Sequence, residues 1–565
     1  MDVEEGVQNR KTAEGRNEMS LDQGAEDTTR RLSLIYGVDD RPSWGLSFVL
    51  GLQHYLTTVG GIFSVPFLLS PALCILPDDP SRGYIMSTIF MVSGIATLFQ
   101  TIVGVRLPII QGSSITFIAC TLAVLDLPQW RCPSDGDLYA MGEANRTEEW
   151  MLRMREIQGA IILSSVFEVL IGYLGLVGLI LHYITPLTIT PTITLVGLSL
   201  VRHGVDMASG NWYISISTVI LLALFSQYLR NVDTKIPVYT LVKGWHVIKV
   251  KGFQLFPVLL TTVALYIVCC LLTRFDVLGE NDPARIDGKM SIVENTEWFR
   301  APYPFQWGWP TFTTSSTLAM LAAVIVGIIE SVGDYYACAK ICGQSIPPTA
   351  AMNRGIGVEG LACVLAGCLG IGTGVTSFSE NIGAIGVTRV GSRKVIQCGA
   401  IIMFVVAFFG KIGAVFSTIP TPVVGGLLCV LFSVVTAVGL SNLQLVDTSS
   451  PRNMFVLGVS MFFGVGIPEW LKLHPGIIST GVLAVDQLFT VLMATPMFVG
   501  GFIGFLLDNT ISGTPEERGV LAWRQANASN RDASNQSDAY SLPKLRWHRL
   551  QKFREELTCL IRRSK

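Results

Sequence analysis

The chain has 565 residues, 50% hydrophobic and 15% charged, and a mean hydropathy of +0.50. Soluble domains carry roughly 25% charged residues, so the composition excludes an ordinary soluble protein and indicates many membrane spans. The net charge of −1 identifies no partner, because the charges are unevenly distributed. The sequence contains no zinc-ligand spacing, phosphate-binding loop or hydrolase nucleophile motif, so we expect no enzyme, cofactor, zinc site or nucleic-acid partner.

The N-terminal segment, residues 1–42, is polar and contains few large apolar side chains. Such a segment cannot bury a core, and we expect it to be disordered and cytoplasmic. It does not have the charged and then apolar pattern of a cleaved signal peptide. The first span must therefore act as its own insertion signal.

About fourteen apolar segments follow, most of them near the length of a spanning helix. They lie at 44–70, 84–104, 111–127, 157–180, 183–203, 213–230, 254–273, 315–337, 356–372, 374–390, 397–418, 422–440, 453–468 and 482–507. An even number of spans places both termini on the same side of the membrane.

Two of these segments, 111–127 and 374–390, begin with Gly, Ser and Thr residues. They are the third and tenth spans, at matching positions in two halves of seven spans. We interpret both as extended segments followed by half-helices, which membrane proteins tolerate only where the backbone lines a cavity or is buried. Paired interrupted spans in two halves predict a transporter with inverted repeats and a site between them.

Basic residues set the expected orientation. Lys and Arg gather in the 229–253 connection, in the 389–396 connection and in the C-terminal tail, so the positive-inside rule places these segments and both termini in the cytoplasm. The 128–156 and 274–312 loops then lie outside.

The same topology makes predictions for sequons and cysteines. Asn145 lies in an expected exterior loop and should carry a glycan, whereas Asn527 and Asn535 in the tail should stay bare. Most of the cysteines lie in apolar runs and are interpreted as small core residues. Cys132 is the only cysteine assigned to an exterior loop, and the sequence leaves a disulfide through it open.

Acidic residues inside the apolar segments are the candidate binding groups. Glu330 and Asp334 are four residues apart and share one helical face, and Glu380 lies in the second interrupted segment. Intramembrane acids are usually functional, although each could instead pair with a cation and only hold helices together. Glu168, a further membrane acid, is interpreted as a helix-packing residue.

Three readings are open for Asp334: a proton carrier, a cation ligand or a helix-end charge. Sodium prefers oxygen ligands, which Asp334, backbone carbonyls and hydroxyls such as that of Ser113 would supply. Alternatively, the hydroxyls of Ser113 and Ser114 only form hydrogen bonds with backbone groups of the interrupted span. His54, in the first span, is as readily a buried structural residue as a ligand.

Several motifs together resemble the nucleobase–ascorbate transporter family over residues 33–507. They are Gln53-His54-Tyr55, Gln111-Gly112-Ser113-Ser114, the Glu330–Ala337 run, and Glu380-Asn381-x-Gly383-x4-Thr388-Arg389, which fits the family signature. The run Asp334–Ala339 is most similar to the animal branch, which contains sodium-dependent vitamin C transporters and a sodium-dependent nucleobase transporter.

The resemblance implies an all-α polytopic fold of about 14 transmembrane segments in two inverted seven-segment repeats, with short strands and half-helices at spans 3 and 10. Spans 1–4 and 8–11 would form a core domain, and spans 5–7 and 12–14 a gate domain that mediates a homodimer in the plasma membrane. The expected boundaries are 43–203 for spans 1–5, 204–314 for spans 6–7 and an extracellular loop, 315–420 for core spans 8–11, 421–508 for gate spans 12–14, and 509–565 for a cytoplasmic tail.

Site roles follow from the same resemblance. Glu330 and Glu380 would hold a base, and backbone or wall contacts would come from Gly61, Ser114, Ile115, Phe378 and Ser379. Coupling would involve Asp334, Ser113 and His54, and the structural motif positions are Gln53, Asn381, Gly383 and Thr388. Asp334 stands where the family's proton symporters have a histidine, which favours sodium coupling.

Substrate choice depends on Glu380, because ascorbate carriers of the family have proline at that position. A carboxylate accepts base N–H groups strongly and repels an ascorbate anion. We therefore expect a sodium symporter that imports uracil, thymine, guanine, hypoxanthine or xanthine by an elevator-like or rocking motion.

The alternatives are an ascorbate or other organic-anion carrier on the same fold, a sulfate- or bicarbonate-type exchanger, a membrane enzyme and a non-transporting receptor. The exchanger would need a positive pocket without buried acids. The enzyme would need a metal cluster or a nucleophile with a base.

Overall fold

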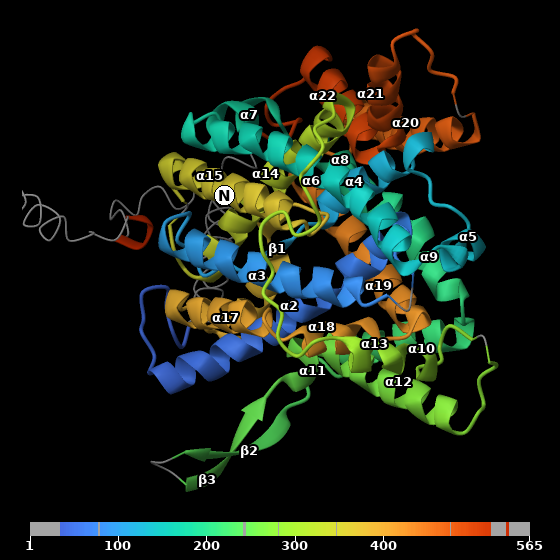
Figure 1. Ribbon diagram of the computed structural model, residues 1–565. Coiled ribbons are helices and arrows are strands. Elements are labelled where there is room, and N and C mark those ends of the chain that lie inside the picture. The colour runs from blue at the N-terminus through green and yellow to red at the C-terminus, as the bar shows by residue number, and fades with distance from the viewer. Residues whose placement is uncertain are drawn as a thin grey trace, which may run out of the picture.

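The computed structural model describes residues 34–76, 79–240, 244–280, 282–345, 347–474, 476–520 and 538–541. The sequons at Asn527 and Asn535 lie outside the described residues. Within them, most of the chain forms helices packed in one bundle (Figure 1). Residues 34–42, which we expected to be disordered, instead lie against the bundle: the Ile35 N–H donates to the Arg389 carbonyl at 2.8 Å, and Val38 is buried.

Helices of spanning length account for much of the bundle. Among the described residues, eight helices are long and apolar enough to cross a membrane. They are α2 (Trp44–Ala72), α3 (Ser81–Ile102), α6 (Glu143–Tyr173), α12 (Pro257–Arg274), α14 (Thr314–Ile341), α15 (Thr349–Leu369), α19 (Thr421–Ser441) and α20 (Pro451–Leu473). The prediction of a polytopic, mainly helical membrane protein is confirmed.

The other expected spans are shorter or broken helices. They comprise α8 (Pro186–Ser199), α9 (Val201–Ser209), α10 (Trp212–Ala223) with η2 (Leu224–Tyr228), α17 (Arg393–Val406), α18 (Gly410–Ser417), α21 (Leu483–Ala494) and α22 (Pro496–Thr510). The last pair bends by 85° at a break next to Pro496, whose ring is compatible with a helix start but not with a helix interior. Segments 397–418 and 482–507, expected as single helices, are therefore each two helices.

The two interrupted segments meet inside the bundle. Strand β1 (Gln111–Ser113) precedes α4 (Ile115–Leu125), and β4 (Val375–Ser377) precedes α16 (Ser379–Thr388). The strands pair antiparallel, with Gln111 opposite Ser377 and Ser113 opposite Val375. All six strand residues are buried, so each strand satisfies backbone groups that its partner would otherwise leave without water.

Helix contacts divide the bundle into two sets. In the first, α6 packs on α14 and α15, while α17 packs on α2 and α3. In the second, α19 packs on α8, α9 and α10, and α22 packs on α8 and α20. Glycines allow close approach in the first set: a Cβ at Gly51 would lie 2.6 Å from the backbone N of Gly399, and one at Gly172 would lie 2.3 Å from that of Gly357.

Short elements lie between the longer helices. They are η1 (Pro128–Trp130), α5 (Asp135–Ala140), α7 (Val177–Tyr183), α11 (Gly252–Leu255), η3 (Asp287–Lys289), α13 (Met290–Asn295), η4 (Asn442–Leu445) and η5 (Asp538–Tyr540). Two of them, α7 and α11, overlap the ends of expected spans. A hairpin of β2 (Thr234–Thr240) and β3 (Gly244–Val250), which the sequence did not lead us to expect, projects from the bundle (Figure 1).

Helix α6 begins fourteen residues earlier than the span expected at 157–180. Its first turn therefore contains Asn145, which is exposed, and its extension contains Glu156, which we had assigned to a loop. Glu156 is buried and accepts hydroxyl hydrogen bonds from Thr311, Thr313 and Ser316 at 2.6–3.0 Å. These bonds fasten the start of α14 to α6.

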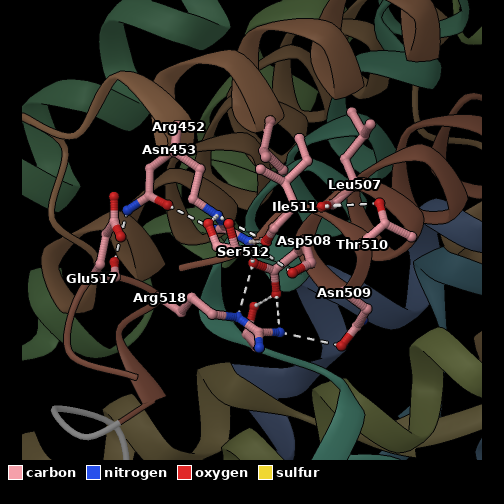
Figure 2. A network of polar contacts seen from close by, with 12 residues as sticks. Arg452, Asn453, Leu507, Asp508, Asn509, Thr510, Ile511, Ser512, Glu517 and Arg518 are labelled. Atoms are coloured by element: carbon pink, nitrogen blue, oxygen red, sulfur yellow. Dashed lines mark hydrogen bonds and ion pairs between the residues drawn. The ribbon is translucent and has the colours of Figure 1, made fainter. Parts of the chain in front are cut away.

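A buried carboxylate also fastens the end of α22 (Figure 2). Asp508 is 1% exposed and pairs with Arg452 of α20 at 3.0 Å and with Arg518 at 2.8 Å. The Thr185 hydroxyl, at the start of α8, donates to the same carboxylate at 2.8 Å. Because the acid is fully paired, its burial joins three helices and the segment after α22 without an orphaned charge.

A disulfide joins two loops of the first helix set. Cys74, just after α2, is bonded to Cys132, with Cα atoms 5.5 Å apart. Our assignment of Cys132 as the only exterior cysteine was wrong, because α2 ends at Ala72 and leaves Cys74 in the following loop. The bond closes a loop with a sequence separation of 58 residues, and disulfides of this kind form mainly in oxidising compartments.

We predict that non-reduced peptide mapping recovers Cys74 and Cys132 in one linked fragment. Cys132→Ser should lower the melting temperature of the detergent-solubilised protein, because a disulfide of this kind contributes about 2–4 kcal/mol. Cys429→Ser, which changes a half-buried free cysteine, is the matched control. Finding free thiols at both positions in protein from the cell surface would contradict the assignment.

Candidate functional site

The strand pair directs two acid-bearing helices toward each other. Helix α16 begins immediately after β4 and contacts both α14 and α2. It therefore brings Glu380, in its first turn, to the face of α14 that carries Glu330 and Asp334. The three acids come from segments fifty residues apart, and the structure gathers them around the point where β1 and β4 pair.

Asp334 is the most enclosed of the three acids, with 8% of its surface exposed. One carboxylate oxygen, Oδ1, accepts the Ser379 hydroxyl at 2.7 Å and so links α14 to the first residue of α16. The other oxygen, Oδ2, is buried and has no hydrogen-bond partner within the described residues. A buried carboxylate oxygen without a partner is costly, so this atom is suited to receive a cation or a ligand donor.

Glu330 and Glu380 are more accessible. Glu330 is half-buried, and its Oε2 accepts the Thr116 hydroxyl of α4 at 3.0 Å. Glu380 is exposed to solvent although α16 is packed between α14 and α2. Because the residue is exposed, water or a solute can reach it, and the exposed sides of α14 and α16 around it are called the opening below.

An aromatic ring forms one wall beside Glu380. The Phe378 ring lies against the backbone of Gly112 in β1: a Cβ added there would lie 2.5 Å from the ring carbon Cζ. A Cβ at Gly61 of α2 would lie 3.7 Å from both the Phe378 ring and Glu380 Oε1. Phe378, 8% exposed, is thus an apolar wall next to the Glu380 carboxylate, and a planar ring that donates N–H groups can contact both.

Asn381 fixes the start of α16 rather than facing the opening. It is fully buried, its Oδ1 lies 3.0 Å from His54 Nδ1, and its Nδ2 donates to the Pro108 carbonyl at 3.0 Å. The residue thus ties α16 to α2 and to the chain before β1. His54, which we grouped with the coupling residues, makes its side-chain bond to Asn381.

The remaining predicted residues surround this centre in different ways. The hydroxyls of Ser113 and Ser114 are buried without a partner in the described part of the chain, and Ile115 begins α4, half-buried. Gln53 is half-buried on α2, and a Cβ at Gly383 would meet open space. Thr388 caps the end of α16, where its hydroxyl accepts the Val390 N–H at 3.2 Å.

The exposed faces of α14 and α16 continue toward one end of the helices. After Glu330, the exposed positions on α14 are Gly333, Ala337 and Lys340, whereas the side chains between Ser315 and Ile329 are mostly buried, with Ile325 exposed. On α16, Gly383 and Arg389 extend the exposed face that begins at Glu380. The opening beside the acids therefore runs toward the ends that carry Lys340 and Arg389.

A second pair of buried acids, Glu359 and Glu168, lies behind the site, and the sequence analysis singled out only Glu168. Glu359 of α15 accepts hydroxyl bonds from Ser331 at 2.5 Å and Tyr335 at 3.1 Å, on the face of α14 opposite the opening. Its neighbour Glu168 is buried beside Cys363, and the Glu168 Oε2 has no hydrogen-bond partner among the described residues. Because Ser331 also accepts the Ser377 N–H at 3.2 Å, this network supports β4 from behind.

Glu359 and Asp508 carried a weak signal in the sequence, since each is a lone acid in an apolar segment. The same reasoning that selected Glu330 would have flagged them. Their partners come from distant segments, so only the fold distinguishes these fully bonded acids from the accessible ones.

Sequence comparisons identify the family of the chain. A model of the Permease family matches residues 45–473. Mouse solute carrier family 23 member 1 is 47% identical over 91% of this chain and 86% of its own length, and human member 2 is 46% identical over 93% and 82%. Nucleobase-ascorbate transporter 1 of Arabidopsis thaliana is 32% identical over 90% and 95%.

The chain belongs to the nucleobase–ascorbate transporter family. It is a membrane transporter and not an enzyme, as predicted.

A solved structure shares the fold at low sequence identity. Murine solute carrier 26 family member A9, described as an anion transporter in the inward-facing state, superimposes with a TM-score of 0.50 at 14% identity. The match covers 75% of this chain and 65% of that longer chain. It supports the common fold and leaves the chemistry of the site to the residues described above.

We predict that Gly112→Ala disturbs the site by displacing the Phe378 ring. Overpacking of this kind costs about 1–3 kcal/mol, so the melting temperature of the solubilised transporter should fall by about 2–8 °C. Gly386→Ala, whose added carbon would approach Ile341 no closer than 4.0 Å, is the matched control. Equal melting temperatures for the two variants would show that Phe378 does not pack on β1.

Proposed function

We propose that the protein is a sodium-coupled symporter that imports nucleobases such as uracil, thymine, guanine, hypoxanthine and xanthine. The observation that carries the proposal is the accessible Glu380 beside the Phe378 ring, with Glu330 on the facing helix. A neutral planar base presents adjacent N–H donors, which two carboxylates accept in charge-assisted hydrogen bonds. The ring offers its apolar face as a stacking surface.

The sodium ion is proposed to be co-transported at Asp334. The unpartnered Oδ2 of Asp334 and the unpartnered hydroxyls of Ser113 and Ser114 are oxygen ligands of the kind that hard cations prefer. A cation bound there also offsets the mutual repulsion of Asp334, Glu330 and Glu380. That repulsion would otherwise oppose binding of any solute that leaves all three acids ionised.

The acids also argue against an inorganic-anion exchanger on this fold. An anion site needs helix N-termini or arginines that face the ligand, without competing carboxylates. Here the N-terminal turns of α4 and α16 are accompanied by Glu330 and Glu380. The fold shared with solute carrier 26 family member A9 therefore does not imply that this chain transports anions.

Transport is proposed to follow the division between the two helix sets. The core would comprise residues 43–203, apart from its fifth span, and 315–420; the gate would comprise the fifth span with 204–314 and 421–508. The opening beside the acids runs toward Lys340 and Arg389 at the proposed cytoplasmic side, which supports an inward-open arrangement. Movement of the core against the gate, elevator-like or rocking, would expose the acids on the other side.

The proposed setting is the plasma membrane, with about fourteen spans, both termini cytoplasmic and a homodimer formed through the gate. The Cys74–Cys132 disulfide supports an exterior position for both loops. Exposed Asn145, on the same side as Cys132, would carry the glycan.

The second candidate function is sodium-dependent ascorbate transport at the same site. This alternative is supported by the name of the plant relatives, nucleobase-ascorbate transporters, which includes both substrates. Like charges in a dry pocket cost several kcal/mol, so the ascorbate anion fits poorly beside Glu330 and Glu380. The two functions separate in a single uptake assay.

We predict saturable, sodium-dependent uptake of radiolabelled uracil or an oxopurine that ascorbate at equal concentration does not inhibit. Glu380→Gln should reduce uptake roughly 10- to 1000-fold, because the amide loses the charge of the bond to the base N–H. Glu297→Gln, at an exposed acid in the loop between α13 and α14, is the control for expression and surface delivery. Saturable ascorbate uptake without competition by any nucleobase would favour the second function.

We predict that Asp334→Asn raises the sodium concentration for half-maximal uptake while the order of preferred bases stays the same. The amide keeps the size of the side chain and its bond to Ser379 but removes the negative charge that attracts the cation. The measurement is uptake against sodium concentration at fixed membrane potential. Uptake that proceeds without sodium and follows an inward proton gradient would refute sodium coupling.

A further inference from the structure

A short segment of the C-terminal tail is bound to the first helix set. The element η5, Asp538–Tyr540, lies against the ends of α15 and α17, where it is the small red turn at the left of Figure 1. Ala539 is 1% and Tyr540 6% exposed, and Tyr540 is part of the main buried cluster. This degree of burial indicates that the tail segment docks specifically on the bundle.

The binding site for this segment consists of charged and backbone groups placed for it. The Arg393 Nη1 donates to the Ala539 carbonyl at 3.0 Å, and the Arg354 Nη2 donates to the Tyr540 carbonyl at 2.8 Å. The Tyr540 hydroxyl donates to the Ser345 carbonyl at 2.5 Å in the α14–α15 connection. Burial raises the pKa of Tyr540, so its hydroxyl remains a donor at cytoplasmic pH.

The arginines are themselves held in position. Arg393, 8% exposed, forms an ion pair with Asp39 of the N-terminal segment, and the Nε of Arg354 donates to the Gly104 carbonyl at 2.8 Å. Each guanidinium thus contacts the rest of the fold with one nitrogen and donates a hydrogen bond to the tail with another. Without the segment, a buried N–H of Arg393 would lose its acceptor.

The same tail is anchored at its other end to the second helix set (Figure 2). Arg518 pairs with buried Asp508 of α22, and the Asn453 Nδ2 of α20 donates to the Glu517 carbonyl at 2.7 Å. The chain therefore leaves one helix set bound at Arg518 and arrives at the other bound at Tyr540. A chain spans at most about 3.5 Å per residue, so the intervening residues 521–537 keep the segment at a high local concentration near its site.

We propose that the cytoplasmic face of the core is a binding site for this chain's own Asp538–Ser541 segment, which acts as a latch between gate and core. The inference rests on the proposed division into a core that moves and a gate that does not. Movement of the core then requires the latch to be released or carried along, and release makes movement easier. Docking itself does not depend on which solute is transported.

Docking is tested by photo-crosslinking in the full-length protein in membranes. Tyr540 is replaced by p-azidophenylalanine, whose azide takes the place of the hydroxyl. On illumination we expect a crosslink to the tryptic fragment 341–354, which contains Ser345. The same amino acid at Trp547, further along the tail, gives the yield from random collisions. A yield at position 540 no higher than at 547 would overturn the docking site, whether or not the protein transports nucleobases.

The latch role is tested by initial uptake rates of labelled uracil and, if uracil is not carried, of ascorbate. Tyr540→Ala and Ala539→Arg, which remove the anchor ring and fill the buried space at Ala539, should each raise the maximal rate at least twofold with an unchanged KM. Tyr540→Phe keeps the ring and should stay close to wild type. Maximal rates unchanged in both disruptive variants, with the crosslink present, would overturn the latch while leaving the proposed function intact.

Discussion

The antiparallel pairing of β1 with β4 is the contact on which the site depends. Extended backbone inside a membrane protein leaves N–H and carbonyl groups that water cannot satisfy, and these two strands satisfy part of each other's needs. The pairing fixes where α4 and α16 begin, and hence where Thr116 meets Glu330 and where Ser379 meets Asp334. It also brings β1 close enough that the Phe378 ring covers Gly112.

Buried acids in this protein fall into two kinds that differ in their partners. Glu156, Glu359 and Asp508 are each surrounded by hydroxyls or arginines, so their negative charge is compensated within the fold. Asp334 and Glu168 each keep a carboxylate oxygen without a partner among the described residues, and Glu380 is exposed. An uncompensated charge is costly in an apolar interior. A cation or a ligand donor that binds at acids of the second kind therefore offsets this cost.

Several side chains that do not face the site support it through hydrogen bonds. Asn381 ties α16 to His54 and to Pro108, and Ser331 connects β4 to Glu359 behind it. These bonds hold the half-helices against α2 and α15 while leaving the face toward the opening free to bind. A binding site needs such support, because its side chains must hold their geometry when a ligand arrives.

Composition and local pattern determined much of this protein. The apolar segments predicted a polytopic helical fold, the Gly, Ser and Thr runs located the two interrupted spans, and Glu330, Asp334 and Glu380 were recognisable as charges in apolar surroundings. These properties are local, because each depends on the cost of placing a residue in lipid or on the backbone it permits. The tertiary structure alone decided which charges are compensated, that Cys74 reaches Cys132, and that Arg354 and Arg393 receive Tyr540. Such pairings join segments far apart in the chain, and no local preference of either partner encodes the other's position.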